Sequence, residues 1–275
     1  MTVSVKLFFD TNVCDKLLKP PYLVHLAEIK TAIRKHYRIV ISSETFIELM
    51  RTFKGGSGEF FKHDQNRMRV MAGWGAYPTF LSLPGEFTMK QSLGLNVPAA
   101  FGPTWFRKTL KTFLAATSRR QLFEDGVPMG KHLVKFDPEI IEQQHKAGEE
   151  SHRKWLQDAA SGQYIYPPPE RWAVGFGEQL GVTLSPEQAT TLANDLSAMY
   201  AFRKASFEIA SKNKNYRWDN RDGDWVDGQQ LGYLCDPSIR LVTDEQPIRQ
   251  KCATSQQSQR VLLLSEFVAN LGITI

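Results

Sequence analysis

Short apolar strands alternate with amphipathic helices at both ends of this chain, and that alternation is the strongest constraint on its fold. Near the amino terminus the sequence predicts strands at 3–9 and 38–41 and helices at 21–37 and 42–53. Near the carboxyl terminus it predicts helices at 225–234 and 246–253, strands at 240–243 and 261–264, and a last helix, EFVANLG, capped by Ser265 and ended by Gly272. Strands and helices in this order form a parallel sheet covered on both faces. We therefore expect one α/β domain assembled from both ends.

The middle of the chain loses the strand signal. The glycine-rich segment at 54–58 resembles a hinge, and helical periodicity is expected at 105–116 and 138–159. A capping-box pattern at Ser185 predicts a helix that runs to about Lys212. The expected organisation is a discontinuous core, 1–54 plus 190–275, interrupted by a mainly helical insertion at 55–189.

Composition excludes several classes of protein. No stretch reaches the roughly 18 to 20 uncharged apolar residues that a membrane span needs, and the first residues lack the pattern of a secretion signal, so we expect a cytoplasmic protein without membrane contact. The three cysteines have no C-x-x-C spacing, which argues against a disulfide framework or a thiolate zinc site. A formal charge of +5 mildly favours polyanionic partners.

Six acidic residues stand where the predicted strands and helices begin or end. They are Asp10 after the first strand, Glu48 in the helix after the second, Asp224 and Asp227 at the start of the helix over 225–234, and Asp244 and Glu245 after the strand over 240–243. Because loops and helix amino termini converge at the carboxyl edge of a doubly wound sheet, we expect these acids to meet there. Mg²⁺ and Mn²⁺ take several oxygen ligands, which such a cluster supplies. Each acid also has a structural alternative, as a helix cap or a solvated side chain.

Four segments resemble, in order, the motifs of the PIN-domain ribonuclease family. They are FFDTN at 8–12, SSETFIEL at 42–49, DWVDGQQLGYL at 224–234 and LVTDEQ at 241–246. The resemblance covers roughly 1–53 and 190–275 and leaves out the middle. It implies a PIN-like fold and hydrolysis of RNA with one or two Mg²⁺ or Mn²⁺ ions.

Carried over one residue at a time, the resemblance implies that Asp10, Glu48 and Asp227 are catalytic metal ligands. The fourth acid has two candidates: Asp244 directly follows L-V-T, whereas the family's T-x-D spacing points to Glu245. The expected supporting residues, which hold the ligands by hydrogen bonds or cap the acidic helix, are Thr11, Asn12, Asp224 and Thr243.

Three residues before the acidic helix are candidate nucleic-acid contacts: Arg217, Trp218 and Arg221. RNA is the expected substrate and DNA the alternative. The resemblance also suggests a toxin-type ribonuclease held by a protein inhibitor, an antitoxin, and leaves homo-oligomerisation open. The rival functions are a catalytically weak PIN-like scaffold that binds RNA or protein, and a structure-selective DNA nuclease.

Overall fold

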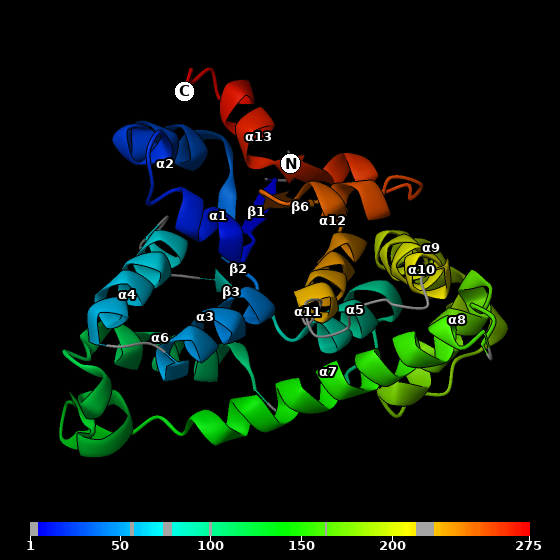
Figure 1. Cartoon of the computed structure of the whole chain (residues 1–275), viewed down its shortest axis with the longest axis horizontal. Coiled ribbons are helices and arrows are strands. Elements are labelled where there is room, and N and C mark those ends of the chain that lie inside the picture. Colours follow the sequence, from blue (N-terminus) through cyan, green and yellow to red (C-terminus); the bar gives the residue numbers. More distant parts are fainter. Residues whose placement is uncertain (1–4, 56–57, 74–78, 99–100, 163, 213–222) are drawn as a thin grey trace.

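A parallel sheet of five strands forms the centre of the computed structural model, which describes residues 5–55, 58–73, 79–98, 101–162, 164–212 and 223–275 (Figure 1). The strands are β1 (Lys6–Phe9), β2 (Arg38–Ile41), β3 (Thr79–Phe80), β6 (Ile239–Thr243) and β7 (Val261–Leu263), in the order β3-β2-β1-β6-β7. Every neighbouring pair is parallel. The α/β prediction from the alternating ends is therefore confirmed.

The strand order places a topological switch point beside β1. The chain proceeds from β1 to β2 and β3 on one side, and then crosses to β6 and β7 on the other. Phe9 at the end of β1 is in register with Val242 in β6. In sheets of this kind the crevice at the carboxyl ends of the two strands that flank the switch point is the usual ligand site. Asp10 follows β1 and Asp244 follows β6 at that edge.

Helices pack on both faces of the sheet (Figure 1). One face is covered by α1 (Thr11–Lys16), α2 (Leu26–His36), α3 (Ser43–Gly55), α4 (Gly58–Ala72), α6 (Pro103–Ala115) and α13 (Leu264–Asn270). The other is covered by α5 (Pro84–Leu93), α8 (Pro169–Gln179), α9 (Pro186–Asp195), α10 (Ser197–Lys212), the 3-10 helix η4 (Leu231–Cys235) and α12 (Gln246–Lys251). The helix α7 (Pro138–Ala160) passes below α3 and α11 (Gly223–Gln230).

The central strand β1 contributes to two separate cores because successive side chains of a strand point to opposite faces. In β1, Leu7 and Phe9 pack among residues of α1 to α4, whereas Phe8 packs among residues of α5, α8, α9, α10 and η4. All three are buried, so the strand is apolar on both sides, as expected for a central strand of a parallel sheet.

The middle of the chain is more closely joined to the sheet than the sequence indicates. The prediction of a mainly helical insertion included no strand in this segment, but β3 pairs with Val40 and Ile41 of β2, and a small hairpin consists of β4 (Val127–Met129) and β5 (His132–Val134). A strand as short as β3 is too brief to show a period of two. Residues 56–57 of the expected hinge lie outside the described residues, and α3 runs to Gly55.

Three local predictions need correction. The single helix expected from Ser185 to Lys212 is two helices that meet at Leu196, although the capping box at Ser185 is confirmed. Ser265 does not cap α13, because that helix already begins at Leu264, whereas Gly272 adopts φ +79° just beyond its end as predicted. Asp224 is not an N-cap, because α11 already begins at Gly223.

Cys14, Cys235 and Cys252 are free and buried. Of the helices in the described ranges, none has both the length and the apolar composition needed to cross a bilayer.

Candidate metal centre

Asp10 is the centre of a polar cluster at the switch point. It ends β1, begins α1 and is 2 % exposed. One carboxylate oxygen accepts a hydrogen bond from the Thr11 amide at 2.6 Å, and the other accepts one from the Thr243 hydroxyl at 2.9 Å. The Gln230 side-chain amide of α11 is 3.5 Å away. Burial raises the pKa of Asp10, and these hydrogen bonds offset only part of that increase.

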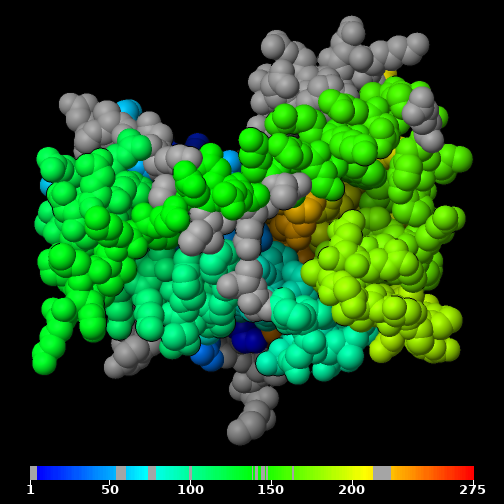
Figure 2. Space-filling model, turned by 90° about the horizontal axis from the view of Figure 1, so that it is seen from below, coloured from blue at the N-terminus to red at the C-terminus, as the bar shows by residue number. Residues whose placement is uncertain are grey.

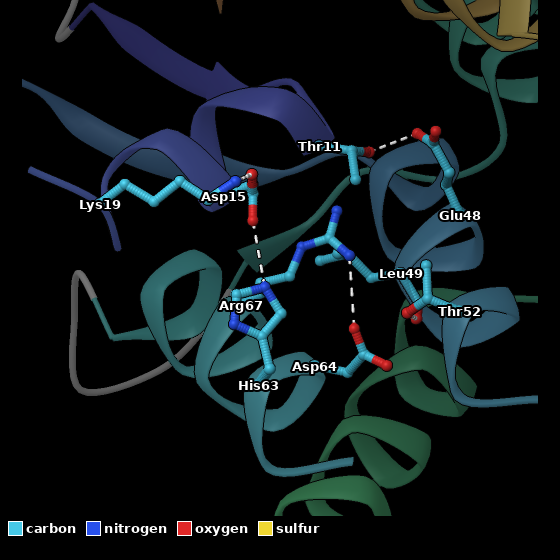
Figure 3. A network of polar contacts seen from close by, with 9 residues as sticks. All are labelled: Thr11, Asp15, Lys19, Glu48, Leu49, Thr52, His63, Asp64 and Arg67. Carbon is cyan, nitrogen blue, oxygen red and sulfur yellow. Dashed lines mark hydrogen bonds and ion pairs between the residues drawn. The ribbon is translucent and has the colours of Figure 1, made fainter. Parts of the chain in front are cut away.

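Glu48 reaches the same cluster from α3. Its carboxylate accepts a hydrogen bond from the Thr11 hydroxyl, as Figure 3 shows. Burial, together with the nearby negative charge of Asp10, raises the pKa of Glu48 to about 7. Asp10 and Glu48 therefore lie together, as the sequence predicts, because the amide of Thr11 donates to one and its hydroxyl to the other.

Asp227 joins the cluster from α11, more than two hundred positions away in the chain. Burial raises the pKa of its carboxyl group well above the ordinary value of 3.8. The charges of Asp10, Glu245 and Glu48 act in the same direction, followed by that of Asp224. Acids from both ends of the chain thus repel one another at one edge of the sheet.

The two candidates for the fourth acid have different partners. Asp244 lies 3.1 Å from the Lys16 ammonium of α1, in an ion pair. Glu245 accepts a hydrogen bond from the Asn12 side chain, and its backbone amide donates to the Thr243 hydroxyl at 3.1 Å. Burial and then the charge of Asp10 raise the pKa of Glu245. The structure therefore brings Glu245 into the cluster and directs Asp244 to a lysine.

A buried ion pair stands beside the acids. Lys251, at the end of α12, is 8 % exposed and lies 2.8 Å from the Asp224 carboxylate. Its ammonium is also 4.5 Å from the centre of the Phe202 ring. The charge of Lys251 lowers the pKa of Glu245. Asp224 is thus held by a cation rather than used as a cap, which corrects its expected role.

Sequence reasoning missed several polar residues at this site. Glu44 lies one turn before Glu48 on α3, and burial followed by the charge of Glu48 raises its pKa to about 7. The spacing of four residues is the only sequence signal that could have found it. Arg67 of α4 lies between α1 and α3 in Figure 3, and its charge lowers the pKa of Glu48. Gln230 lies within the segment DWVDGQQLGYL but had no predicted role, and Lys251 lies outside the four segments.

The expected nucleic-acid contacts cannot be placed. Arg217, Trp218 and Arg221 all fall within 213–222, outside the described residues. The helix that follows them, α11, carries Asp227 toward the acids. These three assignments therefore stay predictions.

The carboxylate oxygens of the cluster are chemically suited to a hard divalent cation, although their side chains are not arranged to bind one together. Among the described residues, no three His, Cys, Asp or Glu side chains stand where they could hold a metal ion together. Glu48 faces the Thr11 hydroxyl and Glu245 faces the Asn12 amide. Carboxylate oxygens are nevertheless the ligands that Mg²⁺ and Mn²⁺ prefer, and a cation would relieve the repulsion among them.

Asp227→Asn is expected to stabilise the protein in the absence of metal. An acid whose pKa is raised by folding reduces stability progressively as the pH rises from its ordinary pKa of 3.8 toward its pKa in the folded protein, and the loss is complete above the latter, so the neutral amide should raise the melting temperature at pH 8. We expect a rise of roughly 2–4 °C for each kcal/mol of repulsion removed, with a smaller effect as the pH falls toward 4. Calorimetry in the presence of chelator measures the melting temperature.

Asp236→Asn is the control, because Asp236 pairs with Lys6 at 2.8 Å and the loss of this ion pair should lower the melting temperature. A lower melting temperature for Asp227→Asn would contradict this view of the cluster.

Comparisons with known proteins add no identity. No protein-family model, curated protein or solved structure matches this chain. The function therefore has to be inferred from the chemistry of the acids at the sheet edge.

Proposed function

We propose that this chain is a divalent-metal-dependent endoribonuclease with a PIN-like site, which hydrolyses phosphodiester bonds of RNA. One observation carries the proposal. Burial, followed by the negative charges of neighbouring acids, raises the pKa of Glu48 on α3, Asp227 on α11 and Glu245 after β6, which meet Asp10 at the switch point of a parallel sheet. Mutual repulsion of this kind is unfavourable for folding, and at functional sites it is the usual preparation for a cation.

The residues that would hold Mg²⁺ or Mn²⁺ are Asp10, Glu48, Asp227 and Glu245. A bound ion of this kind supplies a water of lowered pKa and neutralises charge on a phosphate. The protein itself contributes orientation. The Thr11 amide and the Thr243 hydroxyl fix the two oxygens of Asp10, and Gln230 approaches from α11. Thr11 and Asn12 direct the carboxylates of Glu48 and Glu245.

The Cys14 thiol does not compete with this assignment as a nucleophile. Cys14 is the thiol nearest in sequence to Asp10, and burial raises its pKa to about 12, so the thiolate is scarce at neutral pH. Arg67 is a nearby cation whose guanidinium could donate hydrogen bonds to a phosphate oxygen, since it affects the pKa of Glu48 and lies between α1 and α3.

Cleavage assays with controlled metal test the proposal. We expect the purified chain to cut a single-stranded RNA labelled at one end with Mg²⁺ or Mn²⁺, and to stop in excess EDTA. Undiminished cleavage in chelator would refute it. Single-stranded and flapped DNA of the same sequence, tested in parallel, decide between the ribonuclease and the structure-selective DNA nuclease.

A catalytically weak PIN-like scaffold is the second candidate. The observation that favours it is the orientation of Glu48 and Glu245, which face hydrogen-bond donors rather than a common point. Calorimetric titration with Mn²⁺ separates the two. The nuclease should bind the ion with release of protons, because Glu48 is partly protonated at pH 7, and Asp227→Asn should abolish that binding. A scaffold should show no carboxylate-dependent heat.

A further inference from the structure

A pocket lined by aromatic side chains lies on the far side of α11 from Asp227. It has a volume of about 470 Å³, within the usual range for small-molecule sites. Its aromatic walls are Trp155 of α7, Tyr164, Trp172 and Phe176 of α8, and Trp225 of α11. In Figure 2 the orange segment that contains α11 is visible in a hollow between the green α7 and the yellow-green α8. The pocket therefore combines helices of the insertion with the helix that carries Asp227.

Two polar side chains of this pocket have unused hydrogen-bonding capacity. His152 is 5 % exposed, and neither of its ring nitrogens has a hydrogen-bond partner among the described residues. The Nε of Arg203 is buried and likewise lacks a partner there. Polar groups left in this condition destabilise a folded protein, so such groups at a pocket wall favour a bound partner that satisfies them.

The ionisation of these two residues defines what they can bind. Burial, followed by the positive charges of Arg203 and Lys251, lowers the pKa of His152 to about 3. A neutral imidazole offers one donor and one acceptor. The Arg203 guanidinium lies 4.6 Å from the centre of the Trp225 ring, in a cation–π contact. The wall thus offers a flat cation, a neutral donor–acceptor pair and several indoles.

We propose that this pocket binds an unstacked nucleobase of the single-stranded RNA substrate. Unpaired bases are recognised by stacking on aromatic rings and on arginine planes, and by hydrogen bonds to their edges. Trp172, Trp225 and Arg203 supply the planes, and His152 supplies a donor and an acceptor. The proposal rests on the proposed nuclease function, because the substrate class is taken from it.

A second cavity lies beside the pocket and extends to helix α3. It has a volume of about 280 Å³ and shares Phe176, Gln179, Trp225 and Gln229 with the first. It also reaches Glu44, which lies one turn before Glu48 on α3. On α11, Trp225 and Gln229 are four residues apart and face the cavities, whereas Asp227 faces the other acids. A base held in the pocket would therefore anchor the strand beside the metal centre.

The position of Trp225 depends on the glycine at 148 in α7. A Cβ atom at this position would lie 2.7 Å from two atoms of the indole, Cε2 and Nε1. Helices α7 and α11 are thus in contact at the Trp225 indole. Helix α7 therefore holds the Trp225 ring in place as one wall of the pocket.

Gly175 of α8 allows a test that fills the pocket without disturbing the fold. It lines the pocket, and a Cβ atom built there meets nothing within 4 Å. Gly175→Leu should therefore occupy the pocket, and leucine favours a helix more than glycine does. Thr190→Leu is the matched control, because Thr190 is exposed on α9 and outside the pocket. Trp172→Ala removes one stacking surface instead of filling the space.

The experiment measures binding of a fluorescent single-stranded RNA in EDTA, where cleavage is stopped, and compares it with the same strand lacking bases and with a duplex. We expect wild type and Thr190→Leu to prefer the strand with bases, and Gly175→Leu and Trp172→Ala to bind it about tenfold more weakly or worse. Wild-type affinity in Gly175→Leu, or equal binding of the strand without bases by wild type, would overturn the pocket proposal. If wild type binds the strand with bases preferentially but shows no metal-dependent cleavage, only the proposed nuclease function would be overturned.

Discussion

Replacing Asp10 by asparagine is expected to reduce RNA cleavage on the order of a thousandfold without unfolding the protein. Asparagine keeps an oxygen that can accept from the Thr11 amide, and it nearly preserves the volume of a side chain that is 2 % exposed. It removes the negative charge that the cluster would offer to a cation. The measurement is the single-turnover rate of RNA cleavage at saturating Mn²⁺, with circular dichroism as the check of folding.

Asp244→Asn is the control for this prediction, because Asp244 is also an acid at the same sheet edge but pairs with Lys16 at 3.1 Å. Its rate should stay close to that of wild type. Glu245→Gln should behave like Asp10→Asn, because Glu245 shares the electrostatic environment of Asp10. Equal impairment by Asp244→Asn and Asp10→Asn would show that the fourth acid is wrongly chosen. Full activity in Asp10→Asn would contradict the centre itself.

Phe8→Ala is expected to lower the free energy of unfolding by about 3–5 kcal/mol. Phe8 is fully buried in β1, and its ring centre lies 5.5 Å from that of Tyr233 in an edge-to-face contact. Removing the ring leaves a cavity under η4, the element that follows α11. Urea denaturation followed by fluorescence measures the change.

Val24→Ala is the comparison for this core substitution, because Val24 is 75 % exposed and should change stability by no more than about 0.5 kcal/mol. A loss below about 1 kcal/mol in Phe8→Ala would mean that the second face of the sheet is loosely packed. The prediction therefore also tests whether the helices of the middle segment form a true core with β1.

Several elements followed from the sequence because their signals are local. The β2 strand at 38–41, the helix start at Ser185 and the stop at Gly272 depend on neighbouring residues alone. Strand β3 and the break at Leu196 did not follow, since a two-residue strand has no period and an apolar stripe can continue across a break.

The candidate site divides in the same way. The gathering of six acids could be predicted because the carboxyl ends of parallel strands share one edge, whatever the length of chain between them, and the resemblance of the motifs then selected Asp10, Glu48 and Asp227. The choice between Asp244 and Glu245 could not, because it depends on which side chain meets Lys16 and which meets Asn12.

The sequence by itself determined the alternation of strands and helices, and with it the edge at which the acids gather, because both depend on short-range periodicity and on the direction of parallel strands. Only the tertiary structure decided that Lys251 neutralises Asp224, and that Trp225 forms a pocket with α7 and α8. These contacts join residues far apart in the chain, and no local pattern encodes a distance between two helices. These contacts depend on how the helices pack against the sheet and against one another, which is determined only in the complete fold.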